Sequence, residues 1–424
     1  MNFFAKFFKK LKTKTFFLFP MEEKKETKRI KNEKGVAYLV VMSTLAILAV
    51  LSLQMQQNSA LNSSLSTMVK DKIKSEYNAK SGFNLALYLF TIGDAVTLYT
   101  NQMMGSKEPA ADSQESHWNL INSLPPIGGD MILALNKSKN PKDPFQLLGV
   151  MNKKNREIMQ LFSGSFQVNI NDENGKINLN NCLSGQCKET VDSLEALFSS
   201  PAESAFLESK DINPKELAYS IKDFINNSPN ASLKSGTRDE SAYYRNQEPP
   251  YVAKNRPLDD ISELKLIRGF EDDEVYEIFS PYMTVYPVAD SSGTKPILIN
   301  INTAKPELIA SLVPSSLENQ CREKFIKKMA QLQKDRQAPA SSKEAIKNFF
   351  SDTLCYSADG GAKKEDRQKW FTTKSEAFQF TIVGNTNKMQ TRLKVVIQRA
   401  ESNGKSGSLS QKSSGRSYQI LSWH

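Results

Sequence analysis

The sequence "EKGVAYLVVMSTLAILAVLSLQ", residues 33–54, decides the fold of this chain. It contains no charged residue between Val36 and Leu53. Eighteen helical residues at 1.5 Å each span about 27 Å, close to the hydrocarbon core of a bilayer. Its polar members are Ser43, Thr44 and Ser52, whose hydroxyls can bond back to helix carbonyls. The stretch therefore predicts a membrane-spanning helix over residues 36–53.

The charge distribution predicts how this helix is oriented. The 424 residues carry a net charge of +10, and residues 1–35 account for +7 of it, with eleven Lys and Arg against four Glu. Basic residues ahead of an apolar helix keep its N-terminus cytoplasmic, so the chain after Leu53 is expected outside the cytoplasm. A cleaved secretory signal is the alternative, but the apolar run is long for one. Residues 3–18 suit either an amphipathic surface helix or an overlong leader.

Helical patterning continues beyond the apolar run. Apolar residues recur every four positions and form one stripe on a helix: Leu61, Leu65, Val69, Ile73 and Tyr77. The spacing favours one helix from Met55 to Phe90 whose upper half packs on a folded domain.

Two segments far apart in the chain have the pattern of β-hairpins. In the first, "SFQVNI" (165–170) and "KINLN" (176–180) flank an Asn174-Gly175 turn signal. In the second, alternating apolar residues from Phe378 to Ile397 surround "GNTNK" (384–388). The sequence between them is mostly helical in pattern: 188–198, 213–225, 259–267, 271–279, 303–313 and 321–333. The fold class predicted is α+β, with a long N-terminal helix packed on a small antiparallel sheet and a large, mainly helical domain inserted.

The junction Lys34-Gly35 followed by an apolar helix resembles the prepilin-type processing site of type IV pilins and type II secretion pseudopilins. The resemblance implies cleavage after Gly35 by a prepilin peptidase, which makes Val36 the new N-terminus. Most family members have Glu as the fifth mature residue, and this chain has Val40 there. The minor pseudopilin K of type II secretion characteristically lacks that Glu.

An ordered series of motifs is similar to the K family. It runs through "NAKSGFNLALYLF" (78–90), "NDENGKINLN" (171–180), "IKDFIN" (221–226), "ESAYYRNQEPPYVAKNRPLDDISELKLIRGF" (240–270), "PYMTVYP" (281–287) and "ININTAKPEL" (299–308). The resemblance covers residues 34 to about 399. On this basis the chain divides into a leader (1–35), a transmembrane part (36–53), a pilin-like helix with the first strands (54–182), an inserted helical domain (183–372), a sheet hairpin (373–401) and a flexible tail (402–424).

The loop after residue 222 is rich in hard oxygen donors, which calcium prefers. The resemblance implies a calcium site there, and the candidate ligands are Asp223, Asn226, Asn227, Asp239 and Glu240. Asn226 stands where the family has a carboxylate, and nearby cations weaken the site further. A solvated polar loop is the alternative.

Four cysteines in the chain fit an extracytoplasmic protein with two disulfides. They allow three pairings, and the most local one joins Cys182 to Cys187 and Cys321 to Cys355. Four free thiols are the alternative. A four-cysteine zinc site is disfavoured by the spacing, and with only His117 and His424 a histidine-based zinc site or a catalytic triad is disfavoured too.

The sequence predicts no enzyme, because no nucleophile with a base and no glycine-rich phosphate loop is evident. The resemblance instead implies a minor pseudopilin that caps the periplasmic pseudopilus together with minor pseudopilins I and J. Such a protein is anchored in the bacterial inner membrane by one span, with its bulk in the periplasm. The alternatives are a minor pilin of a type IV pilus and a membrane-tethered DNA-binding protein. Residues 258–270 and 301–314 are similar to helix-hairpin-helix half-motifs but lack the glycine pattern, so no nucleic-acid partner is expected.

Overall fold

The structure is a computed structural model, and it describes residues 33–103, 118, 121–128, 164–183, 187–227, 240–287, 298–312, 319–334, 345–346, 370–386, 388–400 and 417–424. The first 32 residues, with the amphipathic or leader stretch 3–18, lie outside the described residues. The described chain separates into two compact units, which divide after Thr67.

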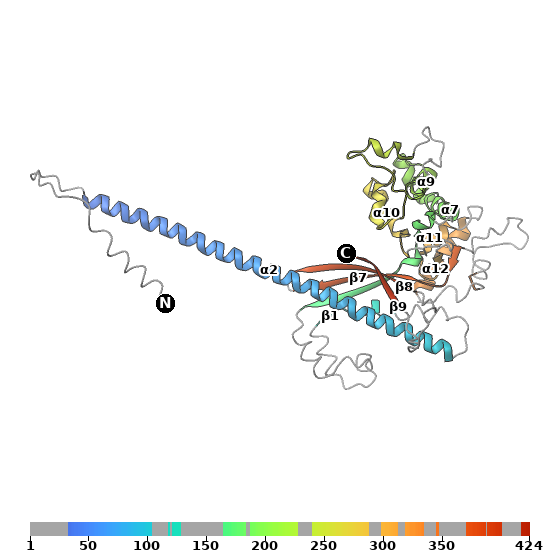
Figure 1. Ribbon diagram of the computed structural model, residues 1–424, viewed down its shortest axis with the longest axis horizontal. Coiled ribbons are helices and arrows are strands. Elements are labelled where there is room, and N and C mark those ends of the chain that lie inside the picture. The colour runs from blue at the N-terminus through green and yellow to red at the C-terminus, as the bar shows by residue number, and fades with distance from the viewer. Residues whose placement is uncertain are drawn as a thin grey trace, which may run out of the picture. The chain divides into compact units, whose positions relative to one another are not determined.

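The predicted long helix is confirmed. Helix α2 runs without interruption from Glu33 to Met103 (Figure 1). As expected from the sequence, the Ser43 hydroxyl donates to the Val40 carbonyl at 2.9 Å, and the Thr44 hydroxyl donates to the Val41 carbonyl at 2.8 Å. These bonds satisfy both hydroxyls within the helix, which suits a segment surrounded by hydrocarbon.

A five-stranded antiparallel sheet packs on α2 between about Asp71 and Phe90. Its strand order is β1-β2-β7-β8-β9. The strands are β1 (Ile127–Gly128), β2 (Ser165–Asp172), β7 (Ala377–Asn385), β8 (Gln390–Ala400) and β9 (Ser417–Trp423). The predicted β7–β8 hairpin is confirmed, with Phe380 opposite Val395 and Asn385 opposite Gln390. Its alternation of apolar and polar residues places one face against the helix.

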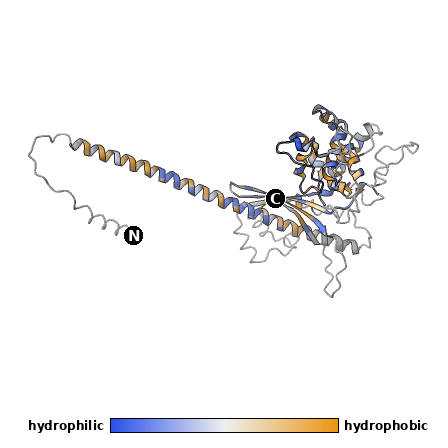
Figure 2. Cartoon of the chain, turned by 45° about the horizontal axis from the view of Figure 1, so that its top comes forward, coloured by the Kyte–Doolittle hydropathy of each residue, from blue (hydrophilic) through white to orange (hydrophobic). Residues whose placement is uncertain are grey.

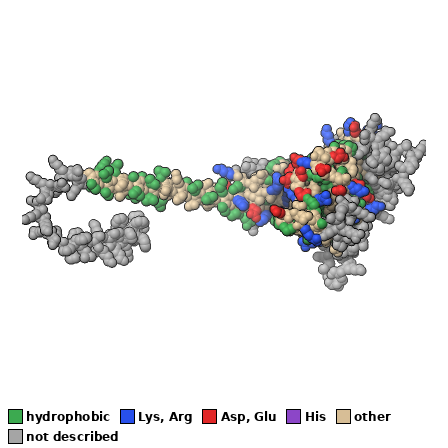
Figure 3. All heavy atoms as spheres, turned by 90° about the horizontal axis from the view of Figure 1, so that it is seen from above, with side chains coloured by type: hydrophobic (Ala, Val, Ile, Leu, Met, Phe, Trp, Pro, Cys, Tyr) green, Lys and Arg blue, Asp and Glu red, His purple; other side chains and the backbone are tan. Residues whose placement is uncertain are grey.

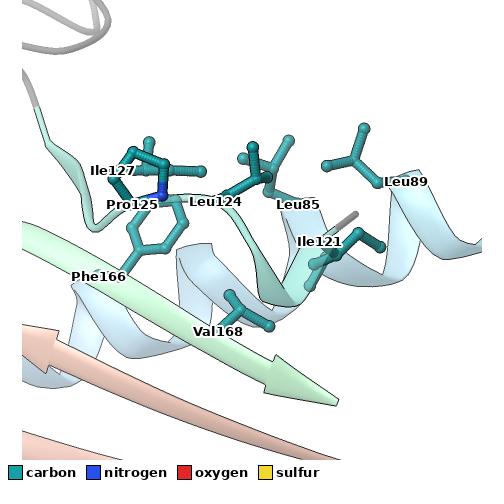
Figure 4. Close-up of a pocket in the computed structure, with 9 residues that line it drawn as sticks. Leu85, Leu89, Ile121, Leu124, Pro125, Ile127, Phe166 and Val168 are labelled. Carbon is teal, nitrogen blue, oxygen red and sulfur yellow. The ribbon is translucent and has the colours of Figure 1, made fainter. Parts of the chain in front are cut away.

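Small residues let α2 approach the sheet closely. A Cβ added at Gly384 would lie 2.2 Å from the Ser75 carbonyl oxygen, and one at Gly82 would lie 2.7 Å from the Phe166 ring. Beyond this point, aromatic side chains fill the interface: Phe83, Phe90, Trp118, Phe378 and Phe380. Residues 121–128 close one side of this core, where Ile121, Leu124 and Ile127 lie against α2 and β2 (Figure 4).

The predicted first hairpin is wrong. Strand β2 pairs with β7 over its whole length, and not with residues 176–180. Asn174 and Gly175 belong to a 3-10 turn, η1 (Glu173–Gly175), in which the Asp172 side chain caps the Asn174 amide. The Asn174 side-chain oxygen accepts hydrogen bonds from the Glu376 and Ala377 amides, so this segment connects to the returning chain rather than folding back on β2.

The inserted domain lies between β2 and β7 and is mainly helical. Its helices are α7 (Cys187–Phe198), α8 (Pro201–Ser209), α9 (Pro214–Ile225), α10 (Asp273–Phe279), α11 (Pro306–Ser311) and α12 (Asn319–Lys334). Short parallel pairs join β3 (Ile177–Asn178) to β4 (Met283–Thr284) and β5 (Ile299–Asn300) to β6 (Phe371–Thr372).

Three details of the insert differ from the prediction. The segment 259–267 forms a 3-10 helix, η5 (Ile261–Leu266), which Asp260 caps together with Glu263. Helix α8, which begins at Pro201, had no prediction. Ile177 and Leu179 pack into the core of the insert, so the inserted domain begins before the predicted boundary at 183.

The chain enters and leaves the insert through a buried polar junction. The Asp172 carboxylate accepts hydrogen bonds from Asn300 Nδ2 at 3.1 Å, from Thr303 Oγ1 at 2.6 Å and from the Ser375 hydroxyl. Its other oxygen accepts the Asn174 amide at 2.9 Å. Burial raises the pKa of the Asp172 carboxyl, because a charge is held away from water. One side chain therefore connects the exit at 172, the turn after β5 and the return at 375.

The prediction of a flexible tail over 402–424 is wrong for its last residues. Ser417–Trp423 form β9 at the edge of the sheet, paired with β8 from Val395 to Ala400. Trp423 contacts the Phe83 ring of α2 edge-on, with ring centroids 5.2 Å apart. Apolar side chains in the last seven residues outweigh the polar composition of the stretch before them. Residues 401–416 lie outside the described residues.

Candidate functional site

The first part of α2 is an exposed apolar rod. It contains the one candidate membrane span found in the described residues, and none of the apolar window is buried. The colouring of Figure 2 shows that hydrophobic residues predominate along this part of the helix. Gly35 and Val36 both lie within the helix and are exposed, and no other group lies within 4 Å of a Cβ built at Gly35. Val40 is 56% exposed. Between residues 36 and 53 there is no carboxylate to pair with a buried amino group.

The stripe recognised in the sequence is not the face that packs on the sheet. We call Leu61, Leu65, Val69, Ile73 and Tyr77 the outer stripe. Its members are between 48% and 66% exposed. The sheet is instead contacted by smaller or polar residues, including Ser75, Asn78 and Ala79, which are buried. Hydrophobic atoms on this segment of α2 remain visible in the space-filling view (Figure 3). An exposed apolar stripe on a helix marks a surface for another protein or for lipid.

Polar contacts hold the sheet against the face of α2 that carries Ser75 and Asn78, which is not the face of the outer stripe. The Ser75 and Thr391 hydroxyls are hydrogen-bonded at 2.6 Å. Asn78 Nδ2 donates to the Asn385 carbonyl at 2.9 Å, and the Thr386 hydroxyl donates to the Asp71 carbonyl at 3.0 Å. Large side chains on this face would separate the helix from Gly384. The outer stripe is thus available for contacts outside its own domain.

The predicted cation loop is partly described. Asp223 lies in the last turn of α9, and Asn226 follows that helix, with its amide donating to the Lys222 carbonyl at 2.9 Å. Asn227 is exposed. Asp239 and the side chain of Glu240 lie outside the described residues. Among the described residues, no group of three or more His, Cys, Asp or Glu side chains is placed to hold a metal ion.

Asn255 lies beside this loop and was not among the candidates taken from the sequence. It has a positive φ of 50°, and its amide donates to the Phe224 carbonyl at 2.9 Å, next to Asp223. Within the described part of the chain, its side-chain oxygen Oδ1 is buried without a hydrogen-bond partner. A buried amide oxygen without a donor is unfavourable in a folded protein unless a cation or water occupies the space beside it. Asn255 is distinguished by its left-handed backbone conformation, and that conformation cannot be predicted from the sequence.

The local cysteine pair is brought together. Cys182 lies in the 3-10 segment η2 (Leu179–Leu183), Cys187 begins α7, and their Sγ atoms are 2.6 Å apart. Both are free thiols in this structure, and the hydrogen bond between them raises the pKa of Cys182 and lowers that of Cys187. Cys355 and the side chain of Cys321 lie outside the described residues.

The fold has a pilin-like architecture: a long N-terminal helix on an antiparallel sheet, here with a helical domain inserted. Residues 175–288 match the family model described as type II secretion system protein K. The chain is 29% identical over 193 residues to type II secretion system protein K of Klebsiella pneumoniae, and 32% identical over 112 residues to that of Aeromonas hydrophila. The resemblance to protein K that the motifs indicated is therefore confirmed.

These alignments are partial. They include 44% and 26% of this chain, and only 52% and 31% of the two relatives. Among solved structures, the chain is similar to one from the GspK-GspI-GspJ complex of the type 2 secretion system of enterotoxigenic Escherichia coli. The TM-score is 0.53 at 16% identity, and the match includes 85% of this chain and 98% of the other. This likeness confirms the predicted pilin-like fold with a helical insert.

Proposed function

We propose that this protein is a minor pseudopilin of a type II secretion system, which caps the tip of the periplasmic pseudopilus during protein export. The observation that carries the proposal is the outer stripe, an apolar surface on α2 that its own sheet leaves exposed. In this proposal the stripe packs on the helices of minor pseudopilins I and J. The solved relative is itself named as a complex of three such proteins. The role is structural, not catalytic.

The test is co-purification of the full chain with minor pseudopilins I and J. Leu65→Lys and Val69→Lys each place a charge within the outer stripe, and we expect them to reduce recovery of the complex at least tenfold. Thr67→Lys is the matched control, because at 100° per residue Thr67 lies on the opposite face of the helix. Undiminished recovery with both stripe variants would contradict the proposal. Co-purification with pilus components instead would favour a minor pilin of a type IV pilus.

We further propose that a prepilin peptidase cuts after Gly35, and that residues 36–53 then anchor the protein in the inner membrane with its bulk in the periplasm. Val40 supports a place above all other subunits, because it offers no carboxylate to the amino terminus of a subunit stacked on top. Intact mass of the membrane-extracted protein tests the cleavage. A mature species beginning at Val36 is expected, and one that retains residues 1–35 would refute it.

Calcium is a proposed ligand of the loop after α9. Its support is the orphan Asn255 Oδ1 beside the Asp223 turn, where hard oxygen donors suit calcium. Isothermal titration of the full chain in micelles should detect calcium binding that Asp223→Ala and Asn255→Ala weaken at least tenfold. Asp273→Ala is the control, since that side chain is 77% exposed on α10. No binding at millimolar calcium would overturn this proposal without affecting the pseudopilin role.

The Cys182–Cys187 contact supports a disulfide between these two residues in an oxidising compartment. Mass analysis of peptides prepared without reductant tests it, and the peptide from residues 182–187 should be two hydrogen masses lighter than after reduction. The DNA-binding alternative is tested by filter binding, where affinity that falls steeply with salt would support it.

A further inference from the structure

Strand β9 has a different neighbour on each of its faces. Tyr418 and Trp423 face α2, where Tyr418 contacts the Phe90 ring at 5.7 Å and Trp423 contacts the Phe83 ring at 5.2 Å. These residues are five apart, so strict alternation would place them on opposite faces. A register shift in the β8–β9 ladder, opposite Val396 and Ile397, changes the alternation by one residue. The bulge therefore turns Ser422 and His424 away from the helix.

The other face of β9 contacts the inserted domain. Burial raises the pKa of Tyr286 and the neighbouring Ser422 hydroxyl lowers it, so these two side chains lie next to each other. His424 Nε2 lies 4.0 Å from the Asp260 carboxylate. Tyr286, two residues after β4, also donates its hydroxyl to the Asp259 carbonyl at 2.9 Å. Its side chain therefore lies between the turn before η5 and strand β9. Asp260 in turn caps η5 through the Ser262 amide.

These contacts are separate from the covalent connections of the insert. The chain leaves the sheet at Asp172 and returns at Ala377, and both points are held by the buried junction around Asp172. Tyr286 and Asp260 belong to other segments of the insert, and β9 reaches them from more than 120 residues further along the chain. A domain held only at the two ends of its insertion pivots about that junction. A further, non-covalent attachment removes this freedom.

We propose that residues 417–424 act as a strap that fastens the inserted domain to the pilin-like sheet through Tyr286 and Asp260. Strand β9 contacts the long helix on one face and the insert on the other, and the bulge keeps both Tyr418 and Trp423 on the helix face. Release of the strap leaves the insert attached at the buried junction around Asp172. The insert is then free to change its orientation while both cores stay folded.

Hydrogen–deuterium exchange of the full chain in micelles tests the strap. The strap variant combines Ser422→Ala and His424→Ala, which removes the β9 side chains beside Tyr286 and Asp260, leaves the Tyr286–Asp259 hydrogen bond of the insert intact and keeps β9 paired with β8. We expect exchange at amides 258–263 and 283–287 to accelerate at least tenfold, and exchange in α7 and α9 to stay unchanged. Gln419→Thr is the matched control, because it changes an exposed residue on the same face of the same strand.

A second variant ends the chain after residue 416 and removes the strap completely. It should accelerate exchange at the same amides at least as much as the strap variant. If removal of β9 unfolds the sheet, the result with the strap variant alone tests the proposal. Unchanged exchange at 258–263 and 283–287 in the strap variant would overturn the proposal, as would equal acceleration by Gln419→Thr.

Discussion

The Asp172→Ala substitution tests whether the junction between sheet and insert is held by one carboxylate. The change removes the acceptor for four donors: the Asn174 amide, Asn300 Nδ2 and the hydroxyls of Thr303 and Ser375. All lie where the side chain is buried, with Asp172 itself 8% exposed. Water replaces the lost acceptor poorly in such a place, so several donors stay unpaired.

The size of the effect follows from these contacts. Each lost hydrogen bond contributes about 1 kcal/mol net, which gives about 4 kcal/mol for four. Removal of a carboxylate whose pKa is raised by burial returns part of this amount, because the folded state no longer holds a desolvated charge. We therefore expect the free energy of unfolding to fall by about 2–4 kcal/mol.

Urea unfolding of the full chain in micelles, followed by tryptophan fluorescence, measures this loss. The described tryptophans report on both parts, since Trp118 lies in the core under the sheet and Trp370 packs against the core of the insert. Asp259→Ala is the matched control. Its side chain is 83% exposed and pairs with Lys254, a kind of contact that contributes about 1 kcal/mol or less. An Asp172→Ala loss no larger than that of the control would refute the reasoning.

Three further predictions concern stability. Burial raises the folded pKa of Asp172 above the ordinary 3.8, so the folded state binds this proton at a higher pH than the unfolded state does. As the pH falls from neutral towards 3.8, the wild type should therefore gain stability relative to Asp172→Asn. A stability difference between the two proteins that urea unfolding shows to be the same at every pH would contradict this. Gly384→Ala should lower the free energy of unfolding by about 3 kcal/mol, because the new Cβ meets backbone atoms of Ser75 and Ala79, and an unchanged urea midpoint would contradict this. Asn213→Ala removes the N-cap of α9 and should lower thermal stability by about 1 kcal/mol, with Asn213→Ser restoring it; equal melting temperatures for all three proteins would show that the cap contributes nothing.

The sequence by itself determined the elements whose pattern is local. The uncharged run from Val36 to Leu53 predicts a long helix without reference to the rest of the chain, because a helix makes its backbone hydrogen bonds within the segment itself. Alternation around "GNTNK" predicts the β7–β8 hairpin, because its partners are adjacent in sequence. The helices at 213–225 and 271–279 begin after an Asn or Asp cap, and the cap and the apolar spacing are both short-range signals. The contact between Cys182 and Cys187 could also be predicted, because the two residues are close in the sequence.

Only the tertiary structure decided which surfaces meet. The outer stripe faces away from the sheet, because Gly82 and Gly384 allow the small side of α2 to approach more closely than large side chains permit. Asn174-Gly175 reads as a hairpin turn, yet Asn174 bonds to residues 376 and 377, which lie 200 residues away. Strand β9 follows a polar stretch and forms because β8 offers an open edge and α2 offers aromatic rings to Trp423. Such contacts depend on pairings across long loops, and no pattern within one short segment contains them.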